Sequence, residues 1–414
     1  MYRRAMTPVL MAIVIGMASA CANASVSSSG GGGAGTDTLV IGAPLGITGS
    51  AAAEGVLTKN GYDLWAEAVN QAGGIKAGGK TYKVEIKYYD DGSDAQRSAQ
   101  LTDRLITQDG VKLLLGPYGT AATNQDAPIA EKNQVVMVEG NGAAESIFSH
   151  GYKYTFGVLS PAKKYAAVMV EMAAGQNPKP ASVAILSAND AFSVEVADGA
   201  QDIANQQGIS VAAYEKYPAN ATDLSNEVTI AKNSGAEMLL NSGHLAESLA
   251  IMKAAKELDY SPKLFAFTVG PTTPDFIQGL GRDAEDVVAS SQWTDTAKYE
   301  GVDIFKTPKN YNDLYTKRFG SAPDYHAADG TAAGVALQLA IEKAGSIDPS
   351  AVRNALANLD AMTFYGQIKF DERGLNVYKP MVVQQIQDGK LKTVWPSDIA
   401  EASVRYPTPS WGQR

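Results

Sequence analysis

The sequence predicts an α/β protein with two lobes, each built on a parallel sheet that is covered by helices on both faces. Short apolar runs alternate with amphipathic segments along most of the chain, which is typical of parallel sheets. This alternation starts again after Ser160. The chain has 414 residues, more than the roughly 250–300 at which a single hydrophobic core usually divides.

The first series of elements precedes residue 140. Its strands are predicted where apolar residues run together or alternate with polar ones, and its helices where apolar residues recur every three or four positions. The predicted strands are 39–45, 82–88, 111–115 and 135–138. The predicted helices run to residue 70, start after Asp94 and start after Thr120.

The turn between residues 113 and 123, with the sequence LLLGPYGTAAT, organises this first series. Pro117 cannot donate to a strand ladder, Gly119 permits backbone angles closed to other residues, and Thr120 is predicted to cap the following helix. Pro128 is predicted to break that helix. Free amides at a helix start bind carboxylates and other anions, although an ordinary loop without a ligand fits this turn equally well.

The second series follows Ser160 and then becomes less regular. In order, we predict a helix to 174, strand 183–186, a helix after 193, strand 211–214, helix 223–233, strand 238–240, helix 246–258 and strand 264–267. Beyond these, strand 287–290, helix 311–319, an Ala-rich helix 327–344 and strands 367–370 and 381–386 are expected. In open α/β sheets ligands lie beyond the carboxyl ends of the strands, which predicts a cleft between the two lobes.

The N-terminal segment predicts export from the cytoplasm. Arg3 and Arg4 precede an apolar run that is too short to cross a bilayer and that ends in small residues before Cys21. This arrangement resembles the lipobox of bacterial lipoproteins, in which the cysteine is lipidated, with plain secretion as the alternative. Residues 1–20 are therefore predicted to be a signal peptide, and residues 21–36 a Ser/Gly-rich tether.

Charge and motif content exclude several other classes of function. Removing Arg3 and Arg4 with the signal takes the formal charge from −9 to −11, so nucleic-acid binding is not expected. The single cysteine excludes an intrachain disulfide, and the three histidines lack metal-ligand spacing. Asp90, Asp91 and Asp94 fit turn and cap positions better than a calcium loop. No catalytic motif is present, so we expect no metal, no cofactor and no enzyme activity.

From Leu39 to about Trp411 the chain resembles the type I solute-binding proteins of bacterial ABC importers, in the branched-chain amino acid and amide-binding branch. The segments that carry the resemblance are VIGAPLGITGS (40–50), NQAGGI (70–75), YYDDGSD (88–94), LLLGPYGT (113–120), APIAEK (127–132) and YGQIKFDERG (365–374). The resemblance implies two Rossmann-like lobes joined by a three-crossing hinge near Gly157, Ser290 and Tyr365. Lobe 1 would comprise 37–157 and 290–364, and lobe 2 would comprise 158–289 and 365–414.

The resemblance also implies positions for ligand-binding residues. In the first lobe they are Tyr118, Thr120 and Ala121 at the organising turn, followed by Gly140, Asn141 and Gly142 in a second loop. From the second lobe, Phe192 and His244 would close over the ligand, and Thr268 occupies the region where related proteins hold the acid for an α-ammonium. No acid lies at Thr268 or Val269, so Glu139 and Glu247 are the candidates to replace it.

The implied function is capture of a small amino-acid-like, amide or carboxylate-bearing solute and its delivery to the membrane permease subunits of an ABC importer. The protein would be a lipid-anchored extracytoplasmic monomer. A ligand-sensing ectodomain with the same fold is the alternative, and genes for a permease and an ATPase beside this one would favour import.

Overall fold

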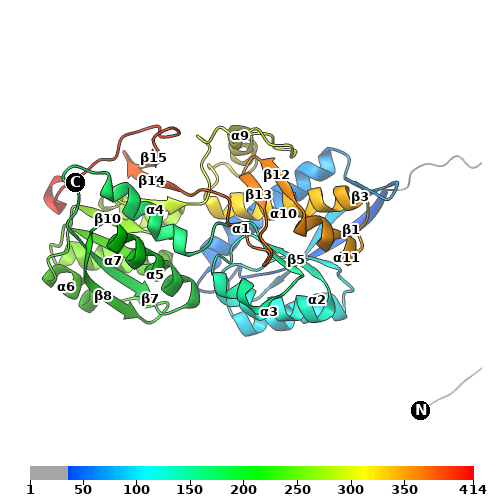
Figure 1. Cartoon of the computed structure of the whole chain (residues 1–414), viewed down its shortest axis with the longest axis horizontal. Helices are drawn as coiled ribbons and strands as arrows, with labels where there is room; N and C mark the ends of the chain where they lie inside the picture. The colour runs from blue at the N-terminus through cyan, green and yellow to red at the C-terminus, as the bar shows by residue number, and fades with distance from the viewer. Residues whose placement is uncertain (1–35) are drawn as a thin grey trace, which may run out of the picture. The chain divides into compact units, whose positions relative to one another are not determined.

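The computed structural model describes residues 36–414 (Figure 1). The predicted signal peptide, the lipidation site Cys21 and the tether up to residue 35 lie outside the described residues. Among the helices of the described part, none combines the length and the apolar character needed to span a bilayer.

The first sheet has six strands in the order β2-β3-β1-β4-β5-β6. Neighbouring strands are parallel except β2, which runs antiparallel to β3. Every residue of β4 and β5 is buried, which explains why both strands are apolar up to the final Glu139 of β5. The strands are β1 Thr36–Leu45, β2 Ile75–Ala77, β3 Lys80–Asp90, β4 Leu113–Leu115, β5 Val136–Glu139 and β6 Thr155–Gly157.

The second sheet has seven strands in the order β15-β14-β11-β10-β9-β7-β8. Its five strands from β11 to β8 are parallel, whereas β14 is antiparallel to β11 and β15 is antiparallel to β14. The strands are β7 Ser182–Ala188, β8 Ser210–Tyr217, β9 Met238–Ser242, β10 Leu264–Phe267, β11 Val288–Ser291, β14 Val382–Gln387 and β15 Lys390–Trp395. The predicted α/β class with two parallel-dominated sheets is confirmed.

Helices cover both sheets, and Figure 1 shows α1, α2, α3, α10 and α11 with the first sheet and α4 to α7 with the second. The helices are α1 Ala52–Gln71, α2 Ala95–Thr107, α3 Thr120–Asn133, α4 Lys163–Ala174, α5 Ala191–Gln206, α6 Ser225–Asn233, α7 Leu245–Glu257, α8 Pro274–Leu280, α9 Pro308–Phe319, α10 Tyr325–Ala344 and α11 Pro349–Ala357. Short 3₁₀ helices are η1 Glu145–His150, η2 Gly281–Ala284 and η3 Trp411–Gln413, and β12 Asp360–Thr363 pairs with β13 Gly366–Lys369 in a separate ribbon.

Helices α1 and α10 are far apart in sequence but pack closely. A Cβ atom at Gly61 would lie 2.1 Å from the carbonyl oxygen of Ala327, and one at Gly334 would lie 2.3 Å from the ring of Trp65. Real Cβ atoms do not approach other atoms so closely, so glycine is required at both positions. Buried apolar residues of both helices, Trp65 among them, belong to one large hydrophobic cluster.

The chain passes between the two sheets after β6, after β11 and again between β13 and β14. Leu375 still forms an isolated bridge to Gly157 of β6, so the last crossing lies between Leu375 and Val382. This is later than the predicted crossing near Tyr365. The reason is that β13 pairs with β12 instead of joining the second sheet.

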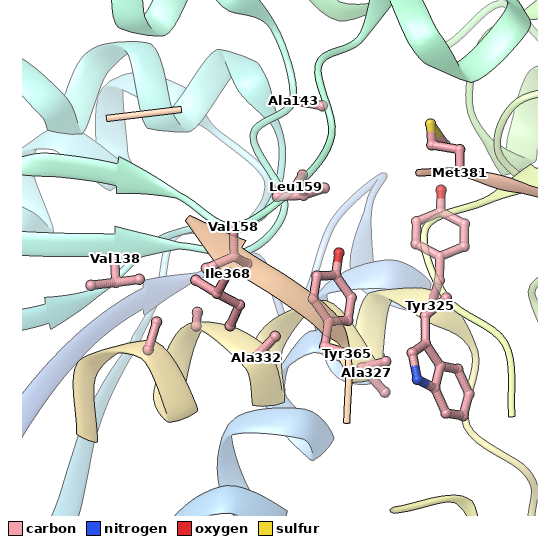
Figure 2. Close-up of a cluster of buried hydrophobic side chains, with 14 of the residues drawn as sticks. Val138, Ala143, Val158, Leu159, Tyr325, Ala327, Ala332, Tyr365, Ile368 and Met381 are labelled. Carbon is pink, nitrogen blue, oxygen red and sulfur yellow. The ribbon is translucent and has the colours of Figure 1, made fainter. Parts of the chain in front are cut away.

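One residue from each crossing takes part in a shared hydrogen-bond network. The Ser160 amide donates to Oε1 of Gln292 at 3.1 Å, and Nε2 of Gln292 donates to the Ser160 carbonyl at 3.1 Å. Ser160 Oγ donates to the Lys379 carbonyl at 2.7 Å, while the Lys379 ammonium donates to the Gln292 carbonyl. All three side chains are buried. Figure 2 shows neighbouring members of the surrounding apolar cluster, including Leu159 and Met381.

Helix α3 differs from the prediction in two respects. Gly119, with a φ of 82°, occupies the cap position, and Thr120 is the first helical residue rather than the cap. The helix also continues through Pro128 to Asn133 without a break. Buried contacts explain this continuity, because Ser98 of α2 donates to Asp126 at 2.9 Å and holds the turn beside the proline.

Candidate functional site

A cavity of about 180 Å³ lies at the carboxyl ends of the strands. Its lining residues come from the lobe built on the first sheet and from the lobe built on the second. A smaller cavity of about 20 Å³ adjoins it, and the two share Tyr118, Gly119, Thr120, Phe192 and His244. The larger cavity is also lined by Gly46, Ser50, Ala51, Glu54, Asp91, Ser93, Ala95, Ala121, Ala122, Asp190, Ala219, Asn220, Ala246 and Glu247. The smaller one adds Asn141, Leu159, Tyr165, Val269, Tyr325 and His326.

On the first-lobe side, the start of α3 presents hydrogen-bond donors to the cavity. Thr120, Ala121 and Ala122 line it, and the first amides of a helix have no partner within the helix. Thr120 is 4% exposed, and its Oγ1 accepts a hydrogen bond from the amide of Ala144 at 3.3 Å. The hydroxyl therefore keeps a proton that it can donate to a ligand. This group of donors can bind a carboxylate or another anion.

On the second-lobe side, Phe192 and His244 begin helices α5 and α7. Phe192 is buried, and its ring centroid lies 5.2 Å from that of Tyr165 and 5.7 Å from that of His244. Both residues line both cavities, so they lie at the boundary between the larger cavity and the smaller one. An aromatic face of this kind can cover an apolar part of a ligand.

The cavity contains an ion pair between His244 and Asp190. Nε2 of His244 lies 3.5 Å from Oδ2 of Asp190. Burial lowers the pKa of His244, but the hydrogen bond and charge of Asp190, together with the charges of Glu247 and Glu54, raise it to about 9. The imidazole is therefore mostly protonated at neutral pH.

We expect His244→Gln to remove a pH-dependent part of the stability. Because the folded state binds the His244 proton more tightly than the unfolded chain does, the stabilisation is fully present below pH ~6.5. It is lost as the pH rises through about 9. Urea unfolding of wild type and variant over this range measures the difference, and Asp190→Asn should abolish the same dependence. A difference that stays constant from neutral to alkaline pH would contradict this assignment.

Four carboxylates line the larger cavity, and three of them have partners. Asp91 accepts from the Ser93 amide at 2.7 Å, and Asp190 accepts from the amide and hydroxyl of Ser193. Glu247 accepts from the amides of Asn220 at 2.6 Å and His244 at 3.2 Å. The fourth is Glu54, which is 2% exposed.

The structure brings most of the predicted ligand-binding residues, but not all of them, into the cavity linings. Tyr118, Thr120, Ala121, Phe192 and His244 line the larger cavity, and Asn141 lines the smaller one. The other three predicted residues, Gly140, Gly142 and Thr268, are in neither lining.

Those three residues shape the surrounding loops. A Cβ atom on Gly140 would lie 2.6 Å from the carbonyl oxygen of Asp329. One on Gly142 would lie 2.7 Å from Oγ1 of Thr123. Thr268 Oγ1 donates to the Gly243 carbonyl at 3.2 Å.

Glu139, which the sequence offered as a replacement for the missing acid, turns into its own loop. It is 0% exposed, and its Oε2 accepts from the amides of Asn141 and Gly142. Burial raises the pKa of Glu139 to about 8, although those two hydrogen bonds lower it. Glu139 is absent from both cavity linings, whereas Glu247 is present.

Sequence reasoning missed several lining residues, namely Glu54, Asp190, Tyr165, Tyr325 and His326. Tyr325 stacks on His326 at 4.0 Å, and Nδ1 of His326 lies 2.5 Å from Oδ2 of Asp324. These residues begin α10, about two hundred positions beyond the organising turn, so no local pattern links them to it. Asp190 carried a usable signal, because it caps the helix that presents Phe192. Within residues 36–414, no group of three or more His, Cys, Asp or Glu side chains is arranged to hold a metal ion.

Comparisons with known proteins agree with this geometry. A family model described as "Periplasmic binding protein" matches residues 38–390. The Leu/Ile/Val-binding protein homolog 8 of Brucella melitensis is 27% identical over 380 residues, covering 87% of this chain and 91% of that protein.

Two solved structures share the fold. The substrate-binding protein LivJ from Streptococcus pneumoniae, in complex with isoleucine, has a TM-score of 0.76 at 21% identity, covering 90% of this chain and 100% of that one. A solute-binding protein of an ABC transporter from Rhodopseudomonas palustris, in complex with 3,4-dihydroxy benzoic acid, has a TM-score of 0.75 at 20% identity, covering 91% and 100%.

Proposed function

Because the chain belongs to the periplasmic binding protein family, we propose that it captures a small carboxylate-bearing or amino-acid-like solute outside the cytoplasm and delivers it to an ABC permease. The similar proteins include one solved with isoleucine and one solved with a dihydroxybenzoic acid, and both of these ligands carry a carboxylate. We therefore take the carboxylate as the feature that the solute of this chain shares with them.

The start of α3 is the observation that carries this proposal. Thr120 and the amides of Ala121 and Ala122 supply donors in one wall of the cavity, and the helix dipole adds a favourable field for an anion. Phe192 and His244 face the same space from the other lobe. A solute bound there would contact both lobes at once, so binding would favour the arrangement in which they lie together.

A further contact joins the two lobes beside the cavity. The Glu195 carboxylate of α5 accepts from the amides of Glu145 at 2.7 Å and Ser146 at 3.1 Å, at the start of η1. This contact supports a closed arrangement of the two lobes. We propose that Tyr118, Thr120, Ala121, Asn141, Phe192 and His244 contact the solute and that Gly140, Gly142 and Thr268 act by shaping the loops around it.

A thermal-shift screen of the purified mature protein tests the proposal. The panel would contain amino acids, aromatic carboxylates, amides, polyamines and oxyanions. A ligand present at about 100 times its Kd stabilises the folded state by about 2.7 kcal/mol. We expect the hits to share a carboxylate and to be recovered chemically unchanged. Hits confined to uncharged or purely cationic compounds would contradict the proposed solute class, and a chemically altered ligand would contradict a binding function.

We further propose that the protein is a monomer anchored to the membrane by a lipid on Cys21. The small residues before this cysteine and the Ser/Gly-rich segment after it support the anchor. In membrane fractions of the native host, Cys21→Ala should move the protein to the soluble fraction, whereas Ser27→Ala in the tether should leave it membrane-bound. Membrane retention of the Cys21 variant would contradict lipidation.

A further inference from the structure

Glu54 is a buried carboxylate in the ligand cavity that has no partner in the described part of the chain. It lies in the first turn of α1, is 2% exposed and lines the larger cavity. Across residues 36–414, Glu54 takes part in one hydrogen bond with a side chain, in which its backbone carbonyl accepts from Thr58. Its carboxylate forms no hydrogen bond and no ion pair in that part of the chain. A carboxylate that lines a cavity without a protein partner is available to a cationic group bound there, and little surrounding water competes for it.

The neighbouring charged groups do not contact Glu54. Its charge is one of those that raise the pKa of His244, but the ion pair of His244 is with Asp190. Asp91, Asp190 and Glu247 already accept hydrogen bonds from backbone amides. The protonated His244 is the only basic side chain in the cavity lining, and it lies against Asp190. Glu54 is therefore the one carboxylate of this cavity lining that neither accepts a hydrogen bond nor forms an ion pair.

The dipole of α1 gives a partial explanation for an acid at this position. A carboxylate in the first turn of a helix is modestly favoured by the helix dipole at exposed sites. The helix dipole would stabilise the carboxylate equally well if the side chain were exposed to solvent and lay outside any cavity. A residue that served only the helix would be expected to point its carboxylate to solvent, whereas Glu54 is nearly inaccessible and lies in the cavity wall.

From this placement we propose that Glu54 binds a cationic group of the solute, so that the solute carries an ammonium or amidinium group as well as a carboxylate. This inference rests on the proposed function, in which the start of α3 binds the carboxylate. Both groups line the same small cavity, so one small molecule can reach both.

Matched pairs of probes test the role of Glu54. Each pair offers the same carboxylate and carbon skeleton with and without the amine: leucine and isocaproate, phenylalanine and hydrocinnamate, and γ-aminobutyrate and butyrate. We expect wild type to bind the amine-bearing member of at least one pair about ten-fold to a hundred-fold more tightly, as expected for a hydrogen bond between charged groups. Glu54→Gln, which keeps the shape but removes the charge, should abolish that preference, and Glu54→Asp should retain part of it.

Glu67→Gln is the control, since this partly exposed acid lies on the same helix, pairs with Arg318 and is not in the cavity lining. It should leave the preference unchanged. If wild type shows no preference for the amine in any pair, or if Glu54→Gln keeps the preference, the proposal is wrong. Amine-free carboxylates that bind tightly to both wild type and Glu54→Gln would overturn the role of Glu54 and leave the carboxylate site intact. Failure of every carboxylate to bind would count against the proposed function as well.

Discussion

Thr120→Val is expected to weaken the binding of a carboxylate-bearing solute by about ten-fold to more than a hundred-fold. Valine keeps the shape of the side chain but removes the hydroxyl of a residue that is 4% exposed and lines the cavity. A hydrogen bond to a charged acceptor contributes about 1.5–3 kcal/mol, which corresponds to this loss of affinity. Isothermal calorimetry with a hit from the solute screen measures the effect.

Thr123→Val is the matched control for this experiment. Thr123 lies on the same helix and is also buried, but its hydroxyl donates to the Gly119 carbonyl at 2.9 Å, and the residue lines neither cavity. The Thr123→Val variant should lose some stability but little affinity for the solute. Thr120→Val also removes the acceptor for the Ala144 amide, so unfolding must be measured separately. If the two variants bind equally well, the anion site is not at this turn.

Lys379→Met is expected to lower the free energy of unfolding by about 3–5 kcal/mol. Lys379 is 1% exposed at the last crossing between the sheets. Its ammonium donates to the Gln292 carbonyl and lies 4.2 Å from the ring centre of Tyr365. Methionine fills a similar volume but has no donor. The variant would therefore leave buried acceptors of the crossing network without a partner.

Asp329 makes the test of Lys379 more specific. It is fully buried, and neither carboxylate oxygen has a hydrogen-bond partner among the described residues. Burial raises the pKa of Asp329 well above its usual range, and the charge of Lys379 is the largest opposing influence. Burial likewise lowers the pKa of Lys379 to about 7, while Asp329 raises it.

Because the two groups interact, their variants should not be additive. The double variant Lys379→Met with Asp329→Asn should lose less stability than the two single variants together. Urea unfolding provides the measurement, and Lys390→Met on an exposed position of β15 is the control. A Lys379→Met protein within about 1 kcal/mol of wild type would show that the crossing network contributes little.

The α/β class and most of the strands and helices were predictable because they depend on local patterns. The apolar run at Leu113–Leu115 indicates a buried strand at any place in a sheet, and the helix starting near Thr120 follows from the residues around it. Two local predictions at α3 were wrong, one through a contact between segments and one by a single position at the helix start. Helix α3 continues through Pro128 with Asp126 held by Ser98 of α2, and Gly119 takes the cap position assigned to Thr120.

The site could be predicted only where a recognisable turn carries it. The turn around Thr120 begins a helix in sequence as well as in space, and Phe192 and His244 likewise begin helices. Glu54 has no such signal, because an acid in the first turn of a helix is common and usually faces solvent. Tyr325 and His326 join the site through the close packing of α10 on α1, which depends on contacts across more than two hundred residues.

The sequence by itself determined that the chain forms two series of alternating strands and helices and that one helix start offers donors for an anion. These properties follow from hydrophobic periodicity and backbone chemistry, which act over a few residues. Only the tertiary structure decided which side chains face the cavity, where the last crossing lies, and that Glu54 remains without a partner there. Burial and pairing are properties of segments brought together from distant parts of the chain, so no local pattern contains them.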